Sequence, residues 1–146
     1  MMSKTSEYPS MKSRTLTLTH NIPISKTKIY WEGLKEGKVY ATKCKKCGEV
    51  YYPPQVDCPN CLTTDVEWIQ LFEGNLETFS QAYLKPQGFG HYEQNYIVAI
   101  AKTAEGVKVM GWLEDVDVKT AKVGIVVKIE AKMMPDGFPA IIFKPK

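Results

Sequence analysis

Hydrophobic and polar residues alternate most regularly near the C-terminus of the chain. Between residues 125 and 133 the odd-numbered positions are all apolar, while positions 128, 130 and 132 are charged. This period of two predicts a strand whose odd-numbered side chains, from Ile125 to Met133, face inward. Related patterns predict further strands at residues 76–84, 96–103, 107–113 and 138–143. Five strands within residues 70–146 predict a small closed barrel of the OB type.

The first 24 residues carry two breakers, Pro9 and Pro23, and are expected to form a flexible N-terminal arm. Thr and Leu alternate over residues 15–19 of this arm. Such a segment favours a short added strand or a contact with a partner.

A helix is predicted over residues 25–38, with Ser25 as its N-cap. Tyr30, Trp31 and Leu34 are three or four residues apart and therefore share one face. This face either packs on the rest of the protein or forms a lid over a partner or ligand. The fold class predicted overall is mainly β, with an N-terminal helix.

All four cysteines fall in two Cys-x-x-Cys pairs, Cys44 with Cys47 and Cys58 with Cys61. They lie in residues 39–69, and a stretch of about 30 residues cannot hold itself together by burial alone, so it needs a cross-link to fold. Two facing pairs place four thiolates in a tetrahedron, which suits Zn²⁺. The spacing predicts a rubredoxin-like zinc ribbon in front of the barrel. Four protein ligands leave no position for water, so the metal is expected to be structural.

The sequence alone also allows other roles for the four thiols. Two disulfides would fit a secreted protein, but the N-terminus lacks the apolar segment of a secretory signal. A redox dithiol needs only one pair. Iron suits the same tetrahedral cage as zinc. A cytoplasmic location, where thiols stay reduced, is the expectation.

The net charge of the 146-residue chain is +3, and it is unevenly placed. Residues 1–28 carry +4, residues 29–69 carry −1 and residues 70–146 are neutral. Arg14 is the single arginine among 19 basic residues. Nucleic-acid readers generally use Arg for phosphates and base edges, so the charge pattern argues against nucleic-acid binding. No segment approaches the roughly 20 apolar residues of a membrane span.

Motifs of catalysis are missing from the sequence. Neither His20 nor His91 stands in a nucleophile or metal-ligand pattern, and no phosphate loop or nucleophile elbow occurs. The acidic residues at positions 114, 115 and 117 are expected to form a solvated turn. With every cysteine assigned to the metal, we expect a protein without enzymatic activity.

The chain resembles a family of zinc-ribbon/OB-fold proteins, catalogued as a domain of unknown function and associated with acyl-CoA enzymes and thiolases. The resemblance covers residues 25–146. It is carried by the helix segment at residues 30–37, both cysteine pairs, Tyr52-Pro53-Pro54, Asp115-Val116-Asp117 and Val123-Gly124.

This resemblance implies a non-catalytic scaffold that binds acyl-CoA and docks on a thiolase-type enzyme. Archaeal relatives bridge an acetoacetyl-CoA thiolase and a hydroxymethylglutaryl-CoA synthase, which are therefore the implied partners. Family members often carry Arg after the two prolines, where this chain has Gln55. Any contact of that Arg with a CoA phosphate would be absent or moved here.

Acyl-CoA needs an apolar slot, a stacking surface for adenine and cations for its phosphates. A loop at residues 85–95, with glycines on both sides of Phe89, is either a ligand-binding flap or an ordinary surface loop. Aromatic candidates for the slot and the stacking surface are Tyr30, Trp31, Phe79, Phe89, Tyr92 and Trp112. Cationic candidates for the phosphates are Lys28, Lys45, Lys46 and Lys85.

Two other functions stay open beside the acyl-CoA scaffold. A nucleic-acid-binding module is the main alternative, because ribbons and OB barrels also occur in such proteins. A small oxidoreductase with an iron–sulfur-ligand centre is the third.

Overall fold

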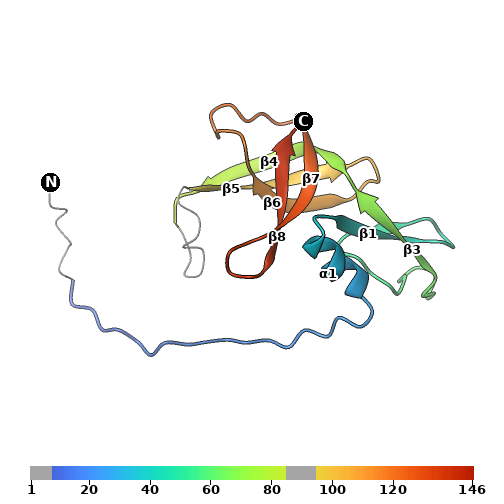
Figure 1. Cartoon of the computed structure of the whole chain (residues 1–146), viewed down its shortest axis with the longest axis horizontal. Coiled ribbons are helices and arrows are strands. Elements are labelled where there is room, and N and C mark those ends of the chain that lie inside the picture. Colours follow the sequence, from blue (N-terminus) through green and yellow to red (C-terminus); the bar gives the residue numbers. More distant parts are fainter. Residues whose placement is uncertain (1–7, 85–94) are drawn as a thin grey trace.

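The computed structural model describes residues 8–84 and 95–146 and shows a mainly β protein with one short helix, as predicted (Figure 1). A three-stranded sheet is followed by a closed five-stranded barrel. The elements are α1 (Lys28–Lys35), β1 (Val39–Cys44), β2 (Val50–Tyr51), β3 (Val66–Leu71), β4 (Glu73–Ala82), β5 (Tyr96–Thr103), β6 (Lys108–Leu113), β7 (Val126–Met133) and β8 (Pro139–Pro145).

The barrel has the strand order β4-β5-β6-β8-β7 and closes where β7 pairs with the start of β4. Strands β6 and β8 run parallel, and their pairing is confined to Trp112 with Ile142 and Leu113 with Phe143. Gly111 permits this approach, because a Cβ there would lie 2.9 Å from the carbonyl oxygen of Ile141. The predicted OB-type barrel is therefore confirmed.

The odd-numbered residues of β7 face inward, as predicted, but only those in the first half of the strand are buried. Val127 and Ile129 are buried, whereas Met133 is 40% exposed. Met133 pairs with Pro139 next to the β7–β8 turn, beyond the packed interior of the barrel. The alternation in the sequence therefore extends beyond the residues of β7 that face the barrel core.

The three-stranded sheet has the order β2-β1-β3. Strand β3 pairs with β1 along its whole length, from Cys44 with Val66 to Val39 with Leu71. It thus runs across the boundary at residues 69/70 that the sequence indicated between ribbon and barrel. The reason is burial: Val39, Ala41 and Leu71 belong to one apolar cluster that continues into the barrel.

Helix α1 is shorter than predicted, because turns occupy residues 25–27 and 36–37. Thr27 rather than Ser25 stands at the N-cap, and its Oγ1 accepts the indole N–H of Trp31 at 3.2 Å. Gly37, with φ of 83°, ends the helix, and its carbonyl oxygen accepts the N–H of Ala131 in β7. The apolar face of the helix packs on the body of the protein. This agrees with one of the two alternatives that the sequence left open.

The N-terminal arm carries no strand between residues 8 and 24, so the added strand expected at residues 15–19 does not form within this chain. These residues are exposed and run away from the body (Figure 1). Over the described residues, no helix is long and apolar enough to cross a membrane.

Candidate metal centre and apolar groove

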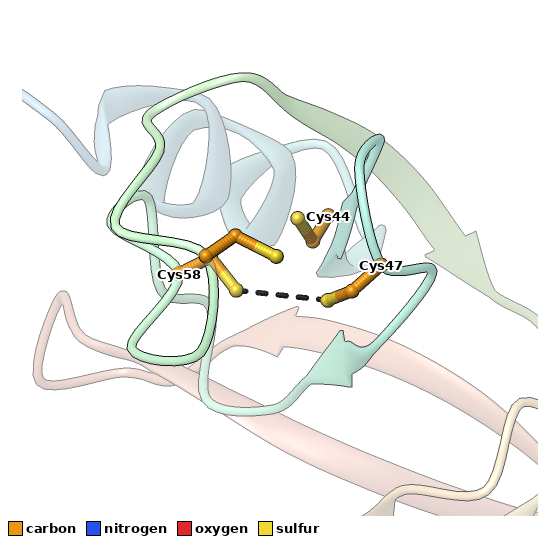
Figure 2. A group of neighbouring side chains, drawn as sticks. Cys44, Cys47 and Cys58 are labelled. Atoms are coloured by element: carbon orange, nitrogen blue, oxygen red, sulfur yellow. Dashed lines mark hydrogen bonds between the residues drawn. The ribbon is translucent and has the colours of Figure 1, made fainter.

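The four cysteine Sγ atoms lie within 4.8 Å of one another. Cys44 ends β1, Cys47 follows in the next turn, and Cys58 and Cys61 come from a second turn. Figure 2 shows Cys44, Cys47 and Cys58 pointing toward one another. All four are free thiols, and the Sγ atoms of Cys47 and Cys58 are 3.7 Å apart, too far for a disulfide. The structure therefore favours a metal cage over disulfides.

The two turns are built alike. The N–H of Gly48 donates to the carbonyl of Cys44 at 2.9 Å, and the N–H of Leu62 donates to the carbonyl of Cys58 at 2.8 Å. Both donors have positive φ, 77° for Gly48 and 54° for Leu62. The sequence signals this conformation only at Gly48, because Leu rarely adopts it.

A tetrahedral metal fits this cage. Four sulfurs, each about 2.3 Å from a Zn²⁺ ion, stand about 3.8 Å from one another. The 3.7 Å between Cys47 and Cys58 meets that requirement directly. A bound zinc ion would cross-link the two turns, and its complete sulfur shell gives it a structural role. Iron fits the same donor set.

Tyr51 contacts the cage from β2. Its hydroxyl lies 3.3 Å from Cys58 Sγ, and donation of this hydrogen bond lowers the pKa of the Cys58 thiol to about 6. The same bond raises the pKa of Tyr51. In contrast, the hydrogen bond with Cys47, together with burial, raises the pKa of Cys61 to about 12. Sequence reasoning missed Tyr51, since tyrosine is not among the usual ligands of a structural zinc site.

The next residue, Tyr52, contacts the helix instead. Its hydroxyl oxygen lies 3.1 Å from that of Tyr30, and the two rings meet edge to face. Burial raises the pKa of both phenols. The ion pair between Lys26 and Asp57, 3.0 Å apart, adds a second contact between the helix region and the ribbon. The ribbon therefore positions α1.

Buried Thr42 holds the segment after Pro53-Pro54 on β1. Its hydroxyl donates to the carbonyl of Gln55 at 2.7 Å and accepts the N–H of the same residue at 2.9 Å. Gln55, the residue where the family often has Arg, is thus fixed through its backbone.

An apolar groove of about 540 Å³ runs between α1, the outer face of β5–β6 and the β7–β8 hairpin. The volume lies in the range of small-molecule sites, roughly 300–1,000 Å³. Among the lining residues that the structure describes, Asp136 is the one that carries a charge. The lining residues are Tyr30, Trp31, Leu34, Tyr96, Val98, Met110, Gly111, Trp112, Met134, Asp136, Phe138, Pro139, Ala140 and Ile141.

Three of the ten predicted ligand residues line this groove, namely Tyr30, Trp31 and Trp112. Tyr96 also belongs to it, with its ring centroid 4.4 Å from that of Trp112. The sequence did not single out Tyr96, which reads simply as the first residue of a strand. The remaining aromatic side chain in the described lining is Phe138, which comes from the β7–β8 hairpin, far away in the chain.

Four other predicted ligand residues that the structure describes lie elsewhere. Phe79 packs against the core, Lys28 pairs with Glu32 at 3.5 Å and Lys45 pairs with Asp65 at 3.3 Å. Lys46 is exposed in the first cysteine turn. The predictions for Lys85, Phe89 and Tyr92 fall outside the described residues. Among the described residues that line the groove there is no cation.

Comparison with known proteins agrees with the division of the chain into a zinc ribbon and an OB-fold barrel. The family model "ChsH2, rubredoxin-like zinc ribbon domain" matches residues 31–67, and "ChsH2, C-terminal OB-fold domain" matches residues 72–132. A DUF35 domain-containing scaffold protein of Methanocaldococcus jannaschii is 32% identical over 79% of this chain and 87% of its own length. One of the same description from Methanothermobacter thermautotrophicus is 27% identical over 72% of this chain and 84% of its own length.

Solved structures show the same fold. An Ltp2-ChsH2(DUF35) aldolase matches with a TM-score of 0.70 at 20% identity, over 80% of this chain and 91% of that one. A DUF35 protein of unknown function from Sulfolobus solfataricus matches with a TM-score of 0.57 at 21% identity, over 84% and 86%. Ribbon, barrel and a 32% identical relative together show that the chain belongs to the DUF35 family of zinc-ribbon/OB-fold proteins, as the sequence motifs predicted.

Proposed function

We propose that this chain is a non-catalytic scaffold subunit that docks on a thiolase-type acyl-CoA enzyme and helps to hold an acyl-CoA ligand. The observation that carries the proposal is the apolar groove on the β5–β6 face, the face with which OB folds commonly bind ligands. The metal cage next to it offers four sulfur ligands and no open position for chemistry.

The groove suits one part of acyl-CoA only. Its aromatic and aliphatic lining fits the acyl chain and the pantetheine arm. The phosphates require cations, and none of the described residues that line the groove is cationic, so we expect a partner enzyme to supply them. This division of the ligand between two proteins explains why a scaffold of this kind would act beside an enzyme rather than alone.

The relatives support a partner enzyme. Two archaeal proteins of the family are named scaffold proteins, and one structural neighbour is an aldolase formed by Ltp2 and ChsH2. We infer a thiolase-type partner, with acetoacetyl-CoA thiolase and hydroxymethylglutaryl-CoA synthase as the first enzymes to test. The four thiols must stay reduced to hold a metal, which favours the cytoplasm as the location.

Ligand binding is tested by calorimetry with free CoA and with acetyl-, acetoacetyl- and octanoyl-CoA. We expect affinity to rise with acyl length and to change little on removal of the 3′-phosphate. Met110→Ser should weaken binding, because Met110 lines the groove and is 62% exposed. Phe72→Ser is the matched control, since Phe72 is 65% exposed and lies outside the groove. Equal binding by both variants, or no binding of any ester, would argue against the ligand half.

The docking half needs a separate measurement. The chain is co-expressed with the thiolase and the synthase of its own organism, and the complex is followed by size-exclusion chromatography with light scattering. Co-elution at a fixed stoichiometry supports the proposal. Separate elution of all three proteins, with and without acyl-CoA, would overturn it.

A further inference from the structure

The N-terminal arm has one apolar face. From residue 14 to residue 24, every odd-numbered position is polar or Pro. The even-numbered positions, which share the other face of an extended chain, are Arg14, Leu16, Leu18, His20, Ile22 and Ile24. Four aliphatic residues, at positions 16, 18, 22 and 24, thus share one face with His20 between them, which is the pattern of a strand that covers an apolar surface.

In the structure this apolar face is uncovered. Leu16 is 79% exposed, Leu18 is 70% exposed and Ile22 is also exposed. The arm leaves the N-terminus of α1 and runs away from its own body (Figure 1). Several large aliphatic side chains on one exposed face mark an interaction surface.

The groove offers the complementary surface. Its floor is apolar, with Met110 62% exposed, and Asp136 is the one charged residue in the described part of its lining. Asp136 Oδ1 accepts the N–H of Phe138 at 3.1 Å, which places the carboxylate in the β7–β8 turn. The arm matches this composition, since aliphatic residues follow the single arginine of the chain, Arg14.

The groove also borders an open strand edge. Strand β6 pairs with β5 from Lys108 onward, but it pairs with β8 only at Trp112 and Leu113. Within the described part of the chain, residues 108–110 therefore have a strand on one side only. An extended segment that enters the groove can add to this edge through main-chain hydrogen bonds.

We propose that two copies of this chain form a dimer by exchanging arms, residues 14–24 of each copy lying in the groove of the other. Leu16 and Leu18 cover the aromatic and aliphatic floor, and Arg14 pairs with Asp136. A second copy is the occupant because residues 14–24 are exposed in the single chain and none of them lines its own groove. A reciprocal exchange also closes the assembly with two-fold symmetry.

The size of the contact agrees with a stable dimer. Each copy contributes eleven arm residues and the fourteen residues that line the groove. A standard protein–protein interface uses roughly 20–30 residues a side. The arm would lie in the same groove that the proposed function gives to the acyl chain, so the arm and the ligand would compete for it. The oligomeric state is therefore measured without CoA, and a failed arm exchange leaves the proposed binding of ligand and enzyme partner standing.

The first test is the oligomeric state of the full, metal-loaded chain by sedimentation velocity over a range of concentrations. We expect a dimer that the double variant Leu16→Ser/Leu18→Ser weakens at least about tenfold. Thr15→Ser/Thr17→Ser, on the opposite face of the arm, is the matched control and should leave the dimer unchanged. All four positions lie outside the folded body, so thermal unfolding of the monomer should not change.

The second test locates the arm. Asp136→Arg should weaken the dimer, and Arg14→Asp in the same chain should restore it. In a mixed sample of two isotope labels, we expect contacts between Leu16 or Leu18 methyls of one copy and the Trp112 indole of the other. A monomer at every concentration, a dimer unaffected by the leucine variants, or methyl–indole contacts within one copy would each overturn the proposal.

Discussion

The hydroxyl oxygens of Tyr30 and Tyr52 lie 3.1 Å apart, one in the helix that walls the groove and the other in the ribbon. Tyr51, the neighbour of Tyr52, directs its hydroxyl to Cys58 Sγ at 3.3 Å. Strand β2 ends at Tyr51, and Tyr52 is the first residue after it. The Tyr51-Tyr52 pair therefore connects the metal cage on one side with the wall of the groove on the other.

Removal of the metal should loosen α1. A ribbon of this kind depends on its metal for folding, and Tyr52 loses its fixed position when the ribbon loosens. We expect hydrogen exchange in residues 28–35 to become about tenfold faster after chelation, equivalent to about 1.4 kcal/mol of local stability. Strand β5, which contacts no part of the ribbon sheet through pairing, is the internal control. Unchanged exchange in α1 would contradict the connection.

Acid should release the metal at a higher pH from Tyr51→Phe than from the natural sequence. Protons compete with the metal for the thiolates, and the hydrogen bond from Tyr51 holds the pKa of Cys58 at about 6. Loss of this donor disfavours the thiolate, raises its pKa and so moves metal release upward by about 0.5–1 pH unit. A colorimetric zinc indicator measures the midpoint. Tyr52→Phe, whose hydroxyl faces the helix, should leave it unchanged.

Leu62→Gly should stabilise the protein. Leu62 holds a φ of 54° and is 90% exposed, so it bears the cost of a left-handed conformation without burying its side chain. Such a conformation costs about 1–2 kcal/mol for a residue other than glycine. Allowing for the greater freedom of glycine in the unfolded chain, we expect a gain of about 0.5–1 kcal/mol in chemical denaturation. Thr64→Gly, at a nearby exposed position with ordinary φ, should lower stability instead.

The two buried threonines should respond oppositely to replacement by valine. Thr42 makes two hydrogen bonds to Gln55, so Thr42→Val should cost about 1–3 kcal/mol. The hydroxyl of Thr103 is buried and has no partner among the described residues. Its removal in Thr103→Val should be neutral or stabilising, by up to about 1 kcal/mol. Equal losses in both variants, by denaturant unfolding, would contradict this assignment.

The sequence by itself determined the local and chemical features of the protein. Cysteine spacing indicates the ribbon because ligand geometry depends on a few adjacent residues. Alternation indicates five barrel strands, and all five form within a few residues of their predicted ends. The family follows from these motifs and is confirmed by comparison.

Tertiary structure decided what depends on contacts between distant segments. Strand β3 continues to Leu71 because Val39 of β1 pairs with it there, which no local pattern shows. Leu62 takes a left-handed conformation because the cage requires a turn like that of Gly48. The groove exists only because α1, β5–β6 and the β7–β8 hairpin pack around one space. The relative placement of these elements depends on packing between segments that are distant in the chain, and the local periodicity of the sequence does not predict it.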